Sequence, residues 1–89
     1  MSPSPLVTIY TRAFCPYCTR ALTLLRRKGA AVKEVDVTFD TDKRHEMFAR
    51  SGRRTYPQIF VGEAHVGGCD DLHALDASGG LDPLLQGAP

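Results

Sequence analysis

The feature that most constrains the fold is a Cys-Pro-Tyr-Cys tetrapeptide at residues 15–18, between a strand pattern and a helix pattern. The apolar, β-branched stretch 6–10 before it is typical of a buried strand. Pro16 suits the first position of a helix, where its missing N–H costs no hydrogen bond. We therefore predict a strand, a turn and a helix, with Cys15 as the N-cap residue. Four residues of the predicted helix follow the spacing i, i+3, i+4 and i+7 of one buried face: Cys18, Ala21, Leu22 and Leu25.

The N-cap position gives Cys15 surroundings that favour a negative charge. The first N–H groups of a helix have no partner within the helix, and the helix dipole adds to their effect. The thiolate is the nucleophile in thiol–disulfide exchange, and Arg12, three residues upstream, adds a positive charge. We therefore predict that Cys15 is the attacking thiol. Cys18, one helical turn further on, is the predicted resolving thiol.

Size and composition restrict the class of protein. The 89 residues suffice for one domain, predicted over 1–89, without a metal or disulfides to hold it together. The formal net charge of +1 gives no reason to expect nucleic acid as a partner. No apolar run approaches the ~20 residues that span a membrane, and the first residues do not resemble a secretory leader. Three cysteines favour a reducing compartment with one reactive pair, so we expect a cytoplasmic protein.

The remaining patterns predict a small α/β domain. Its elements follow the order β-α-β-α-β-β-α, which gives a four-stranded mixed sheet flanked by helices. The first two strands form a parallel βαβ unit, and Gly62-Glu63 joins the last two in an antiparallel hairpin. We expect Asp70 to cap the third helix. After the first helix, the predicted segments are a strand at 32–37, a helix at 40–51, strands at 58–61 and 64–66, a helix at 70–78 and a final helical turn at 81–85.

Two further motifs carry chemistry. Thr55-Tyr56-Pro57 comes directly before the third strand, and a proline there marks a strand start. The residues alone do not say whether the bond before Pro57 is cis; a cis bond would turn the Tyr56 backbone outward toward an extended, peptide-like substrate. Residues 68–71 open the third helix, whose N-terminus forms a second anion-binding corner, while its two aspartates favour a nearby ammonium group.

Taken together, these motifs resemble those of the dithiol glutaredoxins, and most of all the bacterial glutaredoxin 3-type proteins. The matching segments are 15–18, 55–60 and 67–72, and the similarity extends over residues 6–85. The resemblance implies a thioredoxin fold and a role in redox homeostasis. The implied activity is reduction of protein disulfides and glutathione mixed disulfides, with glutathione as co-substrate and no metal. A monomer is expected.

The same resemblance implies a glutathione site. Cys15 would accept the glutathionyl group, and a cis Pro57 would let residues 55–57 pair with the tripeptide backbone. Arg12 and Arg53 match positions that the family uses for the glycine carboxylate or for the thiolate. Tyr56 departs from the family, which commonly has valine there. Asp70 and Asp71, with the backbone at Cys69, would hold the γ-glutamyl end. The implied glutathione contacts are Arg12, Tyr17, Arg53, Thr55, Tyr56, Pro57, Gly68, Cys69, Asp70 and Asp71.

The Cys-Pro-Tyr-Cys motif also allows three other interpretations: a structural zinc site, an iron–sulfur cluster carrier and a reductase-coupled donor. A structural zinc site needs four Cys or His ligands, and the sequence has no second Cys-X-X-Cys. An iron–sulfur cluster carrier would use Cys15 and glutathione in a dimer, but such glutaredoxins typically have another residue in place of Pro16. A thioredoxin-like donor served by a reductase shares the Cys-X-X-Cys helix but not the motifs at 55–57 and 68–71. The sequence does not identify the protein substrates, among which ribonucleotide reductase is a candidate.

Overall fold

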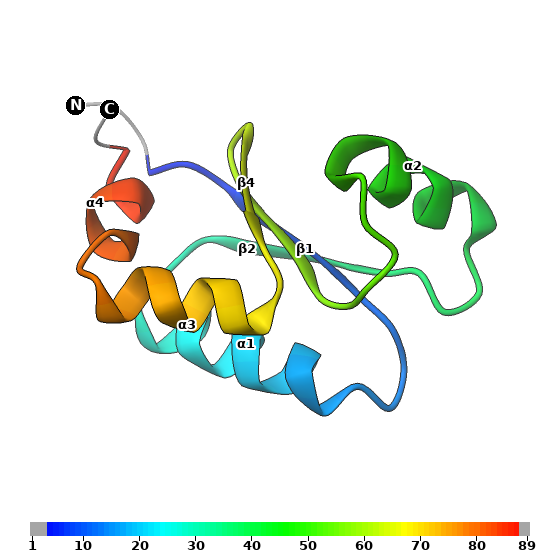
Figure 1. Cartoon of the computed structure of the whole chain (residues 1–89), viewed down its shortest axis with the longest axis horizontal. Coiled ribbons are helices and arrows are strands. Elements are labelled where there is room, and N and C mark those ends of the chain that lie inside the picture. Colours follow the sequence, from blue (N-terminus) through cyan, green and yellow to red (C-terminus); the bar gives the residue numbers. More distant parts are fainter. Residues whose placement is uncertain (1–3, 88–89) are drawn as a thin grey trace.

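A four-stranded sheet forms the centre of the protein, with α2 on one face and α1, α3 and α4 on the other (Figure 1). The computed structural model describes residues 4–87; the ends of the domain predicted over 1–89 lie outside that range. None of the helices within residues 4–87 is long and apolar enough to cross a membrane. The elements are β1 (Val7–Thr11), α1 (Pro16–Arg27), β2 (Val32–Asp36), α2 (Thr41–Ser51), β3 (Gln58–Val61), β4 (Ala64–Gly67), α3 (Cys69–Ala77) and α4 (Leu81–Leu85).

The sheet has the strand order β2-β1-β3-β4, which confirms the predicted mixed topology. β1 pairs in parallel with β2 and antiparallel with β3, and β3 pairs antiparallel with β4. Gly62, the first residue of the β3–β4 loop, has φ +57°, the left-handed value that a type II′ turn requires there. β1 is therefore a central strand, and its end leads directly into the Cys-Pro-Tyr-Cys turn.

The two faces of the sheet are packed differently. Val7 and Ile9 of β1 join the larger apolar core with α1, α3 and α4, and Ala21, Leu22 and Leu25 of the predicted α1 stripe are buried there. On the other face Met47 is the only buried residue of α2, as its thin apolar pattern predicts. Polar contacts also hold α2 against the sheet: the Tyr10 hydroxyl donates to Glu46 Oε2 at 2.6 Å and accepts from Arg50 Nη1 at 2.9 Å.

The start of α3 differs from the prediction. Asp70 is not the N-cap; Gly68 is, and the helix begins at Cys69. The carboxylate of Asp71 reaches back instead, and its Oδ2 accepts the Gly68 N–H at 2.9 Å. Gly67 permits this contact, because it has φ +117° and a Cβ there would collide with the Asp71 carboxylate. The helix N-terminus is thus capped from its third residue rather than from Asp70.

Candidate active site

The turn before α1 fixes the position of the first cysteine. Cys15 is the N-cap of α1 and Pro16 its first residue, which confirms the prediction. Phe14 has φ +56°, a left-handed conformation that is rare for a residue other than glycine and that occurs often at functional sites. The Ala13 N–H donates to Thr38 Oγ1 at 2.7 Å, so the β2–α2 loop holds the turn in place.

The two sulfurs of the tetrapeptide have different surroundings. Cys15 Sγ accepts the Cys18 N–H at 3.3 Å and lies 4.0 Å from the Tyr56 carbonyl oxygen. The exposed fraction is 9% for Cys15 and 3% for Cys18. Burial, followed by the hydrogen bond with Cys15, raises the pKa of Cys18 to about 12. Cys18 is therefore a protonated thiol at neutral pH, held next to the more accessible sulfur at the helix start.

The segment before β3 presents its backbone to Cys15. The Tyr56–Pro57 bond is cis, as the resemblance implies. Gln58, which is fully buried, donates from Nε2 to the Thr55 carbonyl and to Thr55 Oγ1, both at 3.0 Å. Its Oε1 lies 2.8 Å from His65 Nε2 of β4. The conformation of the segment is thus anchored by a buried amide that the sequence analysis did not single out.

A cavity of about 310 Å³ brings most of the predicted glutathione contacts together. Nine of the ten residues predicted from the resemblance line it, and the exception is Arg12. Arg12 lines two neighbouring cavities instead, and its guanidinium carbon lies 5.6 Å from the centre of the Tyr56 ring. The lining residues are Tyr17, Arg53, Thr55, Tyr56, Pro57, Gly68, Cys69, Asp70 and Asp71.

An ion pair forms part of the lining of this cavity. Arg53 Nη1 lies 2.9 Å from Asp71 Oδ2, the oxygen that also accepts the Gly68 N–H. The Gly68 N–H, followed by the hydrogen bond from Arg53, holds the pKa of Asp71 below its ordinary value. Asp71 is therefore a carboxylate at neutral pH, and its second oxygen receives no hydrogen bond from the residues that the structure describes.

The third cysteine is buried beside the same cavity. Cys69 is 4% exposed, and its Sγ lies 3.5 Å from His73 Nδ1, the ring nitrogen that is also 2.9 Å from the Cys69 carbonyl oxygen. Burial raises the pKa of the Cys69 thiol. All three cysteines are free, and residues 4–87 contain no group of three or more His, Cys, Asp or Glu side chains that could hold a metal ion.

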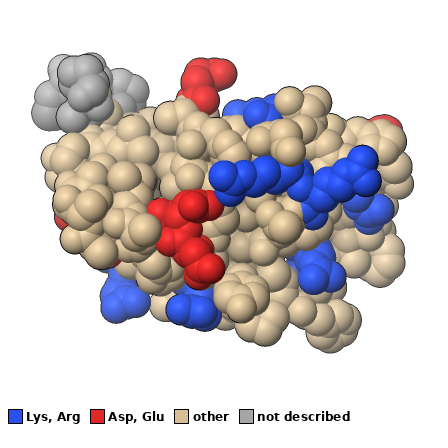
Figure 2. Space-filling model, viewed as in Figure 1, with Lys and Arg blue, Asp and Glu red and all other residues tan. Residues whose placement is uncertain are grey.

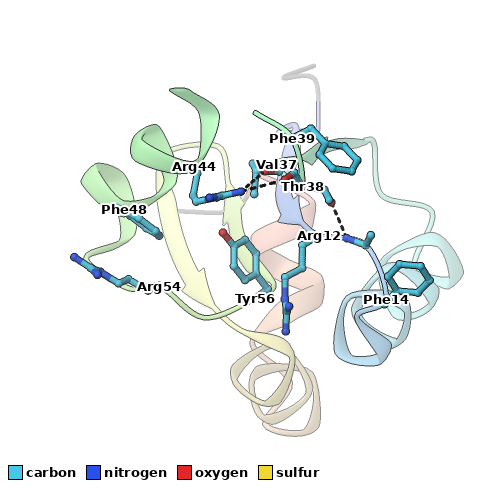
Figure 3. Close-up of a pocket in the computed structure, with 10 residues that line it drawn as sticks. Arg12, Phe14, Val37, Thr38, Phe39, Arg44, Phe48, Arg54 and Tyr56 are labelled. Carbon is cyan, nitrogen blue, oxygen red and sulfur yellow. Dashed lines mark hydrogen bonds between the residues drawn. The ribbon is translucent and has the colours of Figure 1, made fainter. Parts of the chain in front are cut away.

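A second, larger cavity lies on the other side of Tyr56, and sequence reasoning missed most of it. Its volume is about 790 Å³, and Figure 3 shows Tyr56 and Arg12 between Phe48 and Arg54 on one side and Phe14 on the other. One signal could have indicated this cavity. Phe39 stands in a polar turn directly before the N-cap residue of α2, and the fourth helical residue, against which an apolar side chain at this position often packs, is Arg44.

Comparisons with known proteins identify the family of this chain. The family model described as Glutaredoxin matches residues 7–66. Glutaredoxin 3 of Escherichia coli is 58% identical over 80 residues, which are 90% of this chain and 96% of that protein. The solution structure of a Brucella melitensis glutaredoxin, 55% identical, has a TM-score of 0.83 and covers 96% of this chain and 92% of its own. The crystal structure of a buckwheat glutaredoxin–glutathione complex, 28% identical in sequence, has a TM-score of 0.82. The match covers 92% of this chain and 76% of the buckwheat chain. The chain belongs to the glutaredoxin family of thiol–disulfide oxidoreductases.

Proposed function

We propose that the protein is a glutathione-dependent dithiol oxidoreductase that reduces protein disulfides and glutathione mixed disulfides through Cys15 and Cys18. One observation carries the proposal: nine of the ten glutathione contacts expected from the sequence line a single cavity. Tyr56 joins that cavity to the nucleophile, because its carbonyl oxygen lies 4.0 Å from Cys15 Sγ. A solved relative, the buckwheat glutaredoxin, forms a complex with glutathione.

In the proposed binding mode, glutathione lies across Thr55–Pro57 with its sulfur at Cys15. The γ-glutamyl ammonium contacts the open oxygen of Asp71, and the γ-glutamyl carboxylate accepts hydrogen bonds from the first N–H groups of α3. Arg12, outside the cavity but beside Tyr56, contacts the glycine carboxylate. Arg53 keeps Asp71 in position through their ion pair. Tyr17 packs against the side of the tripeptide.

The reaction consists of successive thiol–disulfide exchanges. With a glutathionylated substrate, the Cys15 thiolate attacks the glutathione sulfur, and the substrate thiolate leaves and takes up a proton. A second glutathione then attacks the mixed disulfide on Cys15, which yields glutathione disulfide and free Cys15. With a protein disulfide, Cys18 attacks the mixed disulfide instead, after losing its proton, and two glutathione molecules restore the dithiol. The protein acts as a cytoplasmic monomer in this proposal, and ribonucleotide reductase is one candidate substrate.

The test is turnover of a glutathionylated small disulfide by the purified, reduced protein. We expect NADPH oxidation when glutathione and glutathione reductase are both supplied, and only background oxidation when glutathione is left out. A parallel reaction replaces them with thioredoxin reductase. Turnover in that reaction alone, by a folded and colourless protein, would overturn the proposal in favour of a reductase-coupled donor. A brown protein without turnover would instead favour a cluster carrier.

A further inference from the structure

The cavity on the α2 side of Tyr56 is here called the aromatic groove. It shares only Arg12 and Tyr56 with the proposed glutathione site. Four aromatic side chains line it: Phe14, Phe39, Phe48 and Tyr56. They come from the turn before α1, the β2–α2 loop, α2 and the segment before β3 (Figure 3). The groove holds about 790 Å³, roughly the size that encloses a small organic ligand or a few peptide side chains.

Two of these aromatic residues are fully open to solvent. Phe14 is 100% exposed and Phe39 is 99% exposed. Single exposed apolar side chains are ordinary, but several that converge on one hollow are typical of an interaction site. Phe48 and Tyr56 are partly buried against the small core on the same face, so packing holds these two rings in place.

The groove carries only positive charge. Arg12, Arg44 and Arg54 line it, and no aspartate or glutamate does. Within residues 4–87, none of the three guanidinium groups forms an ion pair. Arg44 donates to the carbonyls of the β2–α2 loop, whereas the guanidinium carbons of Arg12 and Arg54 lie 5.6 and 5.2 Å from aromatic ring centres. Figure 2 shows the same division at larger scale: basic side chains gather over the α2 half of this face and acidic ones over the start of α3.

The groove also borders the residues that surround the reacting sulfur. Tyr56 belongs to both the aromatic groove and the glutathione cavity, and Phe14 is the residue directly before Cys15. A substrate disulfide that reaches Cys15 can therefore extend its flanking residues in two directions. One leads toward the acidic start of α3, and the other leads into the aromatic, basic groove.

We propose that the aromatic groove binds the residues next to the reacting disulfide in protein substrates, and that it selects an aromatic side chain flanked by carboxylates. This inference rests on the proposed function. Charge complementarity identifies the occupant. Carboxylates of the substrate pair with the guanidinium groups of the groove, and an aromatic ring of the substrate covers Phe14 and Phe39. In the step it assists, the Cys15 thiolate forms a disulfide with one substrate sulfur and the other leaves as a thiolate. Cys18 then displaces the bound sulfur, so the peptide is reduced to a dithiol and Cys15–Cys18 is oxidised.

The test compares three synthetic peptides of equal length, each closed by one disulfide. They carry Glu-Phe-Glu, Lys-Phe-Lys or Glu-Ser-Glu next to the same cysteine. With glutathione, glutathione reductase and NADPH present, we expect kcat/KM to be about tenfold higher for Glu-Phe-Glu than for either of the others. Added salt should reduce the advantage over Lys-Phe-Lys and leave that over Glu-Ser-Glu.

Two variants then test the groove itself. Phe39→Ser should remove the preference for phenylalanine over serine, and Arg54→Glu should sharply reduce the preference for glutamate over lysine. Arg27→Glu, at the exposed end of α1, changes the net charge by the same amount and should behave like the wild type. Both groove residues are exposed, so we expect the variants to fold and to turn over the glutathionylated small disulfide at the wild-type rate.

The outcomes separate this inference from the proposed function. Equal kcat/KM for the three peptides would overturn the proposal that the groove selects substrates. So would a preference for Glu-Phe-Glu that is undiminished in both groove variants. If Arg27→Glu altered the preference as much as Arg54→Glu, net charge rather than the groove would be responsible, which also overturns it. Loss of turnover with the glutathionylated small disulfide in the wild type would instead refute the proposed function.

Discussion

Two helices begin beside the same cavity, and they use their N-termini in opposite ways. α1 has no acidic residue in its first turn, and the sulfur of Cys15 accepts one of its N–H groups. α3 has Asp70 and Asp71 in its first turn, and the Asp71 carboxylate accepts the N–H of its N-cap residue. Both ends carry the same partial positive charge. What differs is the group that the sequence provides to meet it.

This difference suits the two ends to different tasks in the proposed function. At α1 the polarised N–H groups are left for the sulfur of Cys15, the proposed nucleophile in thiol–disulfide exchange. At α3 a resident carboxylate meets part of the positive potential, so the corner can attract an ammonium group as well as an anion. The cysteine of α3, Cys69, is buried beneath this corner rather than placed at the cap.

The largest expected effect is at the start of α1. Cys15→Ser should lower turnover of both glutathionylated and protein disulfides by about a thousandfold or more, because a serine hydroxyl is not ionised at neutral pH and cannot form the mixed disulfide. The measurement is coupled NADPH oxidation with each substrate. Substantial residual turnover with either substrate would show that another sulfur is the nucleophile.

A second large effect should divide the two activities. Cys18→Ser removes the resolving thiol and leaves Cys15 in place, so protein disulfide reduction should fall by about tenfold or more while deglutathionylation stays near the wild-type rate. The assignment follows from the raised pKa of Cys18 and its deeper burial. Comparable losses with both substrates would contradict the division of labour. Circular dichroism of the variant serves as the folding control.

An intermediate effect is expected at the start of α3. Asp71→Ala should raise the KM for glutathione by about five- to tenfold, with little change in kcat, because it removes the proposed partner of the γ-glutamyl ammonium. The measurement is the rate as a function of glutathione concentration. Asp71→Asn is the matched control, since it keeps an oxygen that can accept the Gly68 N–H but loses the charge. A KM raised by alanine and unchanged by asparagine would mean that capping, not charge, is responsible.

Local sequence patterns correctly predicted where α1 begins. Pro16, the preceding β-branched strand and the apolar stripe of α1 all require the same helix start, so Cys15 could be placed at the N-cap. At the α3 end two consecutive aspartates allowed two ways of capping. The structure uses Asp71, because Gly67 lets its carboxylate fold back over the Gly68 N–H. That choice depends on a glycine conformation that residue spacing does not reveal.

The contacts between distant segments could not be predicted from periodicity. Arg53 and Asp71 are 18 residues apart and form an ion pair only because the β3–β4 hairpin returns the chain to the same end of the sheet. The aromatic groove combines residues from four separate segments, of which only the turn around Phe14 and the segment around Tyr56 had been linked to the site. A pattern gives the face of an element, but not which loops meet beside it.

The smallest effect is expected at the cysteine of α3, and its absence would be informative. Cys69→Ala should change turnover of both substrates by no more than about twofold, because burial raises the pKa of this thiol and keeps its sulfur from solvent. Iodoacetamide treatment of the reduced wild type at pH 7, followed by peptide mass spectrometry, should modify Cys15 well before Cys69. Early modification of Cys69, or loss of turnover in the alanine variant, would show that both helix starts carry a reactive sulfur, and the contrast between them would fail.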